Sequence, residues 1–440
     1  MKIDINDKTV GGFNYEFLRG VSLEYAGAAQ YGECMETISR VKDGNFNSWI
    51  SEWASTANRV LKYAEEELNL DDKLAAKNAF LRASNYYRMA VFYAPHTDPR
   101  HTELWKRSKE CFNNMIKLMD NPIETVEIDF EGAKLPAYFI SGGKGKRPIL
   151  IAMGGFDSTM EEVYCWIGTK TAEYGWHCII FEDPGQWGAL KLNRGLIFRP
   201  DYEKPVQAVV DYALSRPDVD EDKLALIGYS MGGHLAPRAA AGEPRIKACI
   251  ANTLVVDSGE AARTGLKGLH NTQAIDTMFS FLMRVNAPAR WGFQHSQWTL
   301  GIEKPHEWIE AYTPFNLKGL EENFKNPMLF LFSEDDIIDQ AAPNSKIVSG
   351  ILEFIISLNC DRAVHLFTKK EGASSHCQMG GLSYAHAVIF QWLNQTLCGK
   401  NSRVEPDAAS KDAFVEIFKK YGGEDAEKKA RELLDIARYI

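Results

Sequence analysis

Between residues 122 and 398, short apolar β-rich runs alternate with helical runs, and this feature constrains the fold of the 440-residue chain most. Strand–helix alternation with strands that are apolar throughout predicts a mostly parallel sheet with helices on both faces. Ahead of these strands, the alternating pattern of residues 124–143 predicts a hairpin that turns at Glu131-Gly132. The later predicted strands are PILIAMG, HCIIFE, KLALIG, IKACIAN, PMLFLFS and AVHLFT.

The chain before residue 122 has a purely helical pattern. Apolar residues recur at three- and four-residue spacing in 48–68 and 74–94, and 98–119 predicts another helix. A chain of this length is expected to form two structural units. We therefore expect residues 1–121 to form an all-helical domain and residues 122–398 to form an α/β core.

Two segments depart from the alternation. Residues 256–314 are aromatic and helical where a strand-to-helix connection should be short. They predict an insertion at the carboxyl edge of the sheet, where α/β proteins bind ligands. Residues 399–440 predict a C-terminal helical tail of two polar segments, either solvated or facing a second copy of the chain.

The composition argues against several classes of function. Fifty basic and 59 acidic residues give a net charge of −9 without a basic block, which disfavours nucleic-acid and membrane partners. The first residues are too polar for a secretory signal, and no run of about 18 apolar residues occurs, so we expect a cytoplasmic protein. The eight cysteines are scattered without a CxxC pair, so neither a zinc site nor a disulfide framework is expected.

The stretch ALIGYSMGGHLAPRAAA, residues 225–241, places Ser230 in a G-x-S-x-G pattern between a predicted strand and a predicted helix. Gly228 and Gly232 flank a point where the chain must turn so sharply that side chains would clash. Such a turn puts the serine hydroxyl at a helix N-terminus, where the helix dipole favours a developing negative charge. The pattern therefore predicts that Ser230 is a nucleophile.

A serine nucleophile needs a histidine base and a carboxylate that orients the base. His376, in the loop GASSHCQMGG after the last predicted strand, has the expected place in a serine–acid–histidine chain order. The acid is expected in SEDDIID, where the usual spacing selects Asp336, with Asp335 and Asp339 as competitors. His234, four residues after the serine, is a rival base, although one helical turn down it suits packing below the pocket.

An acyl-transfer site also needs donors for an oxyanion. Gly154-Gly155 ends a predicted strand, and we assign the two donors to the backbone amides of Phe156 and Met231. Asp157 follows this loop and either binds a substrate hydroxyl or caps the next helix. This chemistry needs no metal and no organic cofactor.

Several stretches resemble one family. They are GGFDSTMEE, EDPGQWG, FRPDYEKPVQAVVDYALSRPDVD, GYSMGGHLAPRAAAGEPRIKACIAN and GASSHCQMG. Together they resemble the α/β-hydrolases grouped with 2,6-dihydroxypseudooxynicotine hydrolase and the fungal pigment-pathway hydrolases that shorten polyketide chains. YGECMETISRVKDGNFNSWISEW and AFLRASNYYRMAVFY are similar to that family's N-terminal helical lid domain, so the resemblance covers roughly residues 13–398.

The resemblance implies an α/β-hydrolase fold, a triad of Ser230, Asp336 and His376, and commonly a homodimer. Its better-known members cleave a carbon–carbon bond next to a ketone in aromatic or polyketide substrates, and we expect the same retro-Claisen type of reaction here. A carboxylester or thioester hydrolase with the same triad is the alternative. A binding protein that kept the hydrolase fold without activity is a third reading.

Two departures from the family bear on the pocket. The family's GPGQG turn reads DPGQWG, which puts Asp183 and Trp187 near the expected pocket rim, and His234 follows the nucleophile. The aromatic residues of the insertion, with Tyr86 and Tyr87, either line an aromatic-tolerant pocket or pack the lid. The expected partner is a small aromatic or polyketide-like substrate, bound by Asp157, Asp183, Trp187, His234, Asp257 and Trp291.

Overall fold

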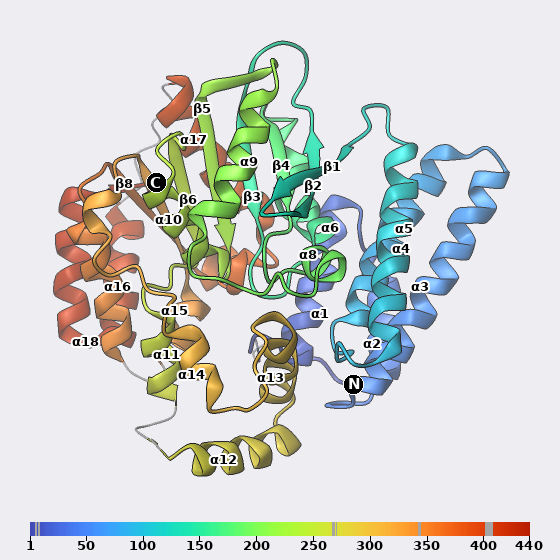
Figure 1. Cartoon of the computed structure of the whole chain (residues 1–440), viewed down its shortest axis with the longest axis horizontal. Coiled ribbons are helices and arrows are strands. Elements are labelled where there is room, and N and C mark those ends of the chain that lie inside the picture. The colour runs from blue at the N-terminus through green and yellow to red at the C-terminus, as the bar shows by residue number, and fades with distance from the viewer. Residues whose placement is uncertain (5–6, 8, 266–268, 270, 342–344, 401–407) are drawn as a thin grey trace. The chain divides into compact units, whose positions relative to one another are not determined.

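The computed structural model describes all residues except 5–6, 8, 266–268, 270, 342–344 and 401–407. It forms two compact units (Figure 1). Unit 1 contains Met1–Glu124, Glu161–Thr169 and Asp276–Gly301. Unit 2 contains Thr125–Met160, Lys170–Ile275 and Ile302–Ile440. No helix of the described residues is both long enough and apolar enough to cross a bilayer.

Unit 1 is helical. Asn45, Asp72 and Asp98 accept hydrogen bonds from the first-turn amides of three long helices, which fixes where each helix begins. These are the helices that the apolar spacing predicts, and they pack in sequence order. The N-terminal elements are α1 (Phe13–Val21), η1 (Ser22–Ala26), α2 (Tyr31–Arg40), α3 (Phe46–Asn69), α4 (Lys73–Val91) and α5 (Pro99–Lys117).

Two later segments complete unit 1. The first holds most of α6 (Met160–Val163) and the π-helix η2 (Tyr164–Gly168). Its Glu162 accepts two hydrogen bonds from Arg19 at 2.7 and 2.5 Å, and both side chains are buried. The second holds most of α12 (Thr272–Val285) and α13 (Ala287–Thr299). The predicted insertion is thus divided, because residues 276–301 pack with the N-terminal helices while its ends belong to unit 2.

Unit 2 is built on one sheet, in which the described residues form nine strands in the order β1-β2-β4-β3-β5-β6-β7-β8-β9. β2 runs antiparallel to β4, and the pairs from β4–β3 through β8–β9 are parallel, as the apolar strand pattern predicts. The strands are β1 (Glu124–Phe130), β2 (Ala133–Ile140), β3 (Arg147–Met153), β4 (His177–Phe181), β5 (Val219–Tyr229), β6 (Ala248–Asn252), β7 (Met328–Ser333), β8 (Arg362–Phe367) and β9 (Arg438–Tyr439).

Helices cover both faces of this sheet, and the strands at its centre are therefore buried along their whole length. α10 packs on β5 and β6, and α9 packs against α10. The main helices of unit 2 are α8 (Trp187–Leu192), α9 (Glu203–Ser215), α10 (Gly232–Gly242), α11 (Ser258–Gly265), α14 (Glu307–Tyr312), α15 (Glu334–Ala341), α16 (Ser345–Ser357), α17 (Leu382–Cys398) and α18 (Ala408–Ile436).

The C-terminal segment is part of this core. α18 packs beside α16 (Figure 1), and β9 extends the sheet by pairing with β8. Phe414 and Phe418 of α18 are buried and contact Phe332 of β7. The helix is polar on most of its surface, and its few buried apolar residues pack mainly against α16. A solvated tail is therefore not what the structure shows.

Candidate active site

Ser230 lies at the turn between β5 and α10, with a positive φ of 59°. A Cβ on Gly228 would lie 2.0 Å from the Gly232 carbonyl oxygen, and a Cβ on Gly232 would lie 2.4 Å from the Gly154 carbonyl oxygen. Both positions therefore require glycine, as the G-x-S-x-G pattern predicts. The tight turn presents the serine side chain at the carboxyl end of the sheet.

His376 connects Ser230 to Asp336. Its Nε2 lies 2.8 Å from the Ser230 Oγ, and its Nδ1 lies 2.7 Å from the Asp336 Oδ1. The three residues follow β5, β7 and β8, so the parallel strands bring them to one edge of the sheet. The three side chains that the sequence selects thus form a continuous hydrogen-bond chain.

The electrostatic setting of His376 favours its charged form. Burial of the imidazole lowers its pKa, but the adjacent Asp336 carboxylate, together with Cys377, outweighs burial and holds the pKa well above the ordinary value of 6.5. An imidazole with this partner accepts a proton readily, which is what a general base for a serine hydroxyl needs.

The neighbouring carboxylate has a different partner. Asp335 accepts a hydrogen bond from the Ser374 Oγ at 2.8 Å and lies 3.2 Å from the Lys369 Nζ. It therefore anchors the loop that leads to His376 and does not face the imidazole. The third candidate acid, Asp339, has its side chain outside the part of the chain that the structure describes.

The predicted oxyanion loop lies against the nucleophile turn. A Cβ on Gly155 would lie 2.6 Å from the Ser230 Cβ and 3.0 Å from the Met231 backbone nitrogen. The loop is held from the other side, because Gln186 Nε2 donates to the Gly155 carbonyl at 2.9 Å. Phe156, the next residue along the loop, is half-buried. The loop and the nucleophile turn are thus close enough for their backbone amides to serve one carbonyl oxygen.

The segment DPGQWG braces this loop. Trp187 is buried, and its indole N–H donates to the Asp157 carbonyl at 2.8 Å. Asp183 is fully buried, accepts a 2.6 Å hydrogen bond from the Tyr202 hydroxyl, and has its pKa raised well above the ordinary value by burial. Both side chains are buried, and the Trp187 indole N–H and the Asp183 Oδ1 have hydrogen-bond partners within the unit. Asp157 itself is also buried.

His234 is buried below the nucleophile turn. Its Nδ1 donates to the Val255 carbonyl at 2.7 Å, and burial lowers its pKa to about 4. The ring is therefore neutral near pH 7 and its Nδ1 proton is committed to the backbone. This geometry fits the packing reading of His234 better than the reading as a rival base.

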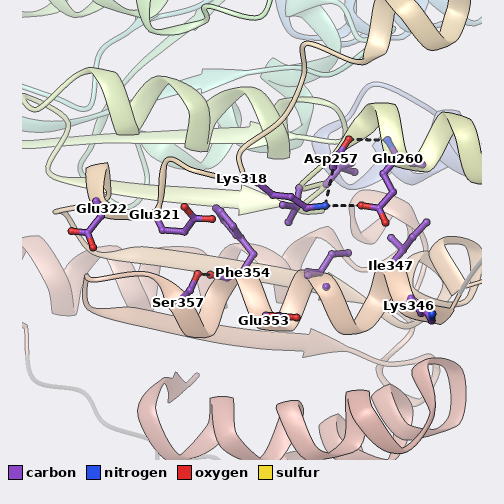
Figure 2. Close-up of a pocket in the computed structure, with 15 residues that line it drawn as sticks. Asp257, Glu260, Lys318, Glu321, Glu322, Lys346, Ile347, Glu353, Phe354 and Ser357 are labelled. Atoms are coloured by element: carbon purple, nitrogen blue, oxygen red, sulfur yellow. Dashed lines mark hydrogen bonds and ion pairs between the residues drawn. The ribbon is translucent and has the colours of Figure 1, made fainter.

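Asp257 and Trp291 lie in other surroundings. Asp257 Oδ1 accepts from the Glu260 amide at 2.7 Å, and its Oδ2 accepts from Lys318 at 3.4 Å. Asp257 lines a cavity of about 940 Å³, whose described lining residues include Phe354 of α16 (Figure 2). None of the three residues in the hydrogen-bond chain is among these described lining residues. Trp291 belongs to unit 1, where it stacks on Phe92 with ring centroids 4.6 Å apart.

Sequence reasoning missed two residues at the end of β6. Thr253 Oγ1 donates to the Asp336 Oδ2 at 2.7 Å. Asn252 and Gln378 form a buried amide pair, with N···O distances of 2.7 and 3.0 Å, and Gln378 Nε2 also donates to the Ser333 Oγ at 2.9 Å. The available signal was the polar pair Asn252-Thr253 at the end of the predicted strand IKACIAN.

Known proteins are similar to this chain along most of its length. The profile of the FrsA-like esterases matches residues 26–287. The 20-hydroxy-prefusarin hydrolase FUS2 of Gibberella moniliformis is 31% identical over 412 residues, which cover 88% of this chain and 97% of that protein. Hydrolase acrC of Aspergillus aculeatus is 30% identical over 415 residues, covering 87% and 96%.

Solved structures share the fold. The 2,6-dihydroxy-pseudo-oxynicotine hydrolase matches with a TM-score of 0.65 at 21% identity over 87% of this chain and 97% of its own. AbyA5 matches with a TM-score of 0.59 at 19% identity, over 90% and 98%. These similarities confirm the α/β-hydrolase fold and the family resemblance that the sequence motifs indicate.

Proposed function

Because the chain belongs to the FrsA-like family of α/β-hydrolases, we propose that it is a serine hydrolase whose catalytic triad is Ser230, His376 and Asp336. The observation that carries this proposal is the hydrogen-bond chain through His376, with heavy-atom distances of 2.8 and 2.7 Å. Such distances allow proton transfer from a serine hydroxyl without rearrangement of the site.

The proposed substrate is a small organic molecule with a 1,3-dicarbonyl or acyl-phenol unit. The Ser230 Oγ attacks one carbonyl carbon while His376 Nε2 takes the hydroxyl proton. The Phe156 and Met231 amides receive the resulting oxyanion, a contribution of about 3–4 kcal/mol per donor. Asp336 holds the imidazole in the tautomer that accepts at Nε2 and stabilises its positive charge.

Collapse of this intermediate breaks the carbon–carbon bond. The bonding electron pair leaves with the carbon fragment as an enolate, which takes the proton from His376. The acyl group remains on Ser230, and a water molecule, deprotonated by His376, releases it as a carboxylic acid. Direct attack by water on the substrate, with Ser230 only positioning that water, is the competing route to the same products.

An ester or thioester hydrolase is the second candidate. It is favoured by the description of the matching family as esterases. The same triad serves both reactions, which differ in whether the leaving group departs through carbon or through oxygen or sulfur. We rank the ketone substrate first because the sequence motifs resemble those of carbon–carbon hydrolases.

Two matched substrates that share one aromatic acyl group, a 1,3-diketone and an ester, separate the candidates. Products are quantified by mass spectrometry for the wild type and for Ser230→Ala. Cleavage of the diketone at a rate comparable to that of the ester, lost in the variant, supports the carbon–carbon hydrolase. Cleavage of the ester alone identifies an esterase, and equal products from both proteins reject Ser230 as the nucleophile.

We also propose that residues 1–121 act as a lid domain and that the protein is a homodimer, as the family resemblance implies. Light scattering coupled to size-exclusion chromatography tests the second point directly. A mass of about 50 kDa rather than twice the 49.5 kDa chain mass would reject the dimer.

A further inference from the structure

Asn252, the last residue of β6, contacts the segments that carry two of the proposed triad residues. Its carbonyl accepts a hydrogen bond from the Ser230 backbone N–H at 2.8 Å. Its side-chain amide pairs with Gln378, which lies two residues after His376. Both side-chain amides are fully buried, so each supplies the hydrogen bonds that water would otherwise make to the other. The end of β6 is thus hydrogen-bonded both to the turn that carries Ser230 and to the loop that carries His376.

Thr253, the next residue, contacts Asp336, the third residue of the proposed triad. Its hydroxyl donates to the Asp336 Oδ2 at 2.7 Å, while the Oδ1 of the same carboxylate faces His376. A carboxylate held at one oxygen can still rotate about its Cβ–Cγ bond, whereas one held at both oxygens has its plane fixed. Thr253 and Asp336 are 6% exposed, so this hydroxyl stands where water does not readily take its place.

The backbone of Thr253 is strained. Its φ is +63°, a left-handed conformation that disfavours β-branched residues and that glycine or asparagine adopts more easily. The turn also presses the Thr253 carbonyl oxygen to within 2.1 Å of where a Cβ on Gly233 would lie. Glycine at 253 would relieve the strain but would present no hydroxyl to Asp336, so the strained residue supplies a contact that the relaxed one lacks.

We infer that Thr253 is a positioning residue for the proposed triad, acting through Asp336 while Asn252 fixes its backbone against the nucleophile turn. This inference rests on the proposed function of Ser230, His376 and Asp336. The Thr253 hydroxyl touches no reacting atom. It fixes the carboxylate plane, which in turn sets the direction of the imidazole Nε2 toward the serine.

The rate at which a fluorophosphonate probe labels Ser230 tests this inference, because the probe reports activation of the serine whatever the natural substrate is. Thr253→Val keeps the shape and removes the hydroxyl, so we expect labelling about 10- to 100-fold slower. Thr253→Ser restores the donor, and we expect a rate within about threefold of the wild type. With a cleaved substrate, kcat should fall in Thr253→Val while KM stays within about twofold.

Two further variants separate positioning from a loss of structure. Thr253→Gly lacks the hydroxyl but relieves the backbone strain, so it should fold and still label slowly. Thr299→Val removes another buried threonine hydroxyl, which donates to the His295 carbonyl in its own helix, and should label like the wild type. A purely structural role for Thr253 predicts instead that slow labelling accompanies a lowered thermal midpoint and that Thr253→Gly labels normally.

The possible failures can be told apart. A wild-type protein that fluorophosphonate does not label rejects the proposed serine nucleophile. A wild type that labels, with Thr253→Val or Thr253→Gly labelling at the same rate, overturns the positioning role alone. If the valine variant does not fold, the glycine and serine variants decide the question.

Discussion

The Nε2 of His376 lies 2.8 Å from the Oγ of Ser230, although 146 residues separate them in the chain. This distance depends on the order of strands, since β5 and β8 carry the two residues to the same edge with β6 and β7 between them. The segments that follow β6 and β7 therefore fill the gap. They supply Thr253 and Asp336, and the proposed chemistry depends on their placement as much as on the serine itself.

Replacing Ser230 with alanine removes the proposed nucleophile. We expect kcat for hydrolysis of the better of the two matched substrates to fall by at least about 10⁴-fold. The free energy of unfolding should change little, because the positive φ at this position strains serine and alanine alike. Steady-state kinetics and urea denaturation measure the two effects. Ser215→Ala, which removes an exposed hydroxyl bonded to the Tyr212 carbonyl, is the control with unchanged activity.

The raised pKa of His376 predicts the pH dependence of activity. A general base works in its neutral form, so a pKa above the ordinary 6.5 means that kcat/KM falls with decreasing pH already above pH 6.5. Asp336→Asn removes the negative charge and should move this acid limb to lower pH while it reduces the maximal rate. If kcat/KM of the wild type began to fall only below pH 6, the raised pKa of His376 would be contradicted.

His234 should make the fold less stable in mild acid. Its folded-state pKa of about 4 lies below the ordinary 6.5, so the unfolded chain binds the proton more readily. The resulting stability is fully present above pH 6.5 and is lost between pH 6.5 and about 4, up to about 3 kcal/mol. Urea unfolding of the wild type and of His234→Asn at pH 7.5 and pH 5 measures this effect.

Comparing the wild type with His234→Asn removes the contribution of other histidines to the pH dependence of stability. Burial also lowers the pKa of His177 and of His365, and both residues remain in the variant. The wild type should therefore lose more stability on acidification than the variant does. Equal losses in both proteins would show that His234 is not the neutral buried imidazole described above.

Glu162 of unit 1 should be sensitive to neutralisation. It pairs with Arg19 and lies 3.2 Å from the Arg88 guanidinium, and the three side chains are at most 4% exposed. Glu162→Gln removes the buried carboxylate that contacts both guanidinium groups, while Glu16 remains 3.4 Å from Arg19. We expect a loss of about 3–5 kcal/mol in the free energy of unfolding.

A surface pair provides the matched control. Arg40 and Glu36 form an ion pair whose side chains are 39% and 75% exposed. Glu36→Gln should cost less than about 1 kcal/mol, because water screens this pair. Chemical denaturation of both variants checks the difference, and similar losses would contradict the importance of burial for the Glu162 cluster.

The sequence predicted the sheet and the three residues of the hydrogen-bond chain because each of these features is local. The strands are apolar runs, and Ser230, Asp336 and His376 each follow such a run at a recognisable spacing. Among neighbouring carboxylates the sequence alone left a choice. Asp335 and Asp336 are adjacent in the first turn of α15, so their side chains leave the helix in different directions. In the structure it is Asp336 that contacts the imidazole.

The contacts that sequence reasoning missed are non-local. Asn252 and Gln378 are 126 residues apart, and nothing within either segment indicates that the two amides meet. Asp183 and Trp187 show a second limit, since the burial of a turn residue depends on hydrogen-bond partners elsewhere in the fold. The buried face of α18 shows a third limit of sequence reasoning. A polar helix with a few buried apolar residues has nearly the same sequence pattern as a helix that is exposed to solvent on all sides.

The discontinuity of unit 1 has a consequence for how the chain is made. Arg19 leaves the ribosome 143 residues before Glu162, which at about 5–20 residues per second amounts to roughly 7–30 s of synthesis. During that interval Arg19 has Glu16 of its own helix at 3.4 Å, but Glu162, which accepts two of its hydrogen bonds, does not yet exist. The helical unit therefore cannot reach its final packing as it emerges. It has to wait for a stretch of chain that is synthesised only after the first strands of the other unit.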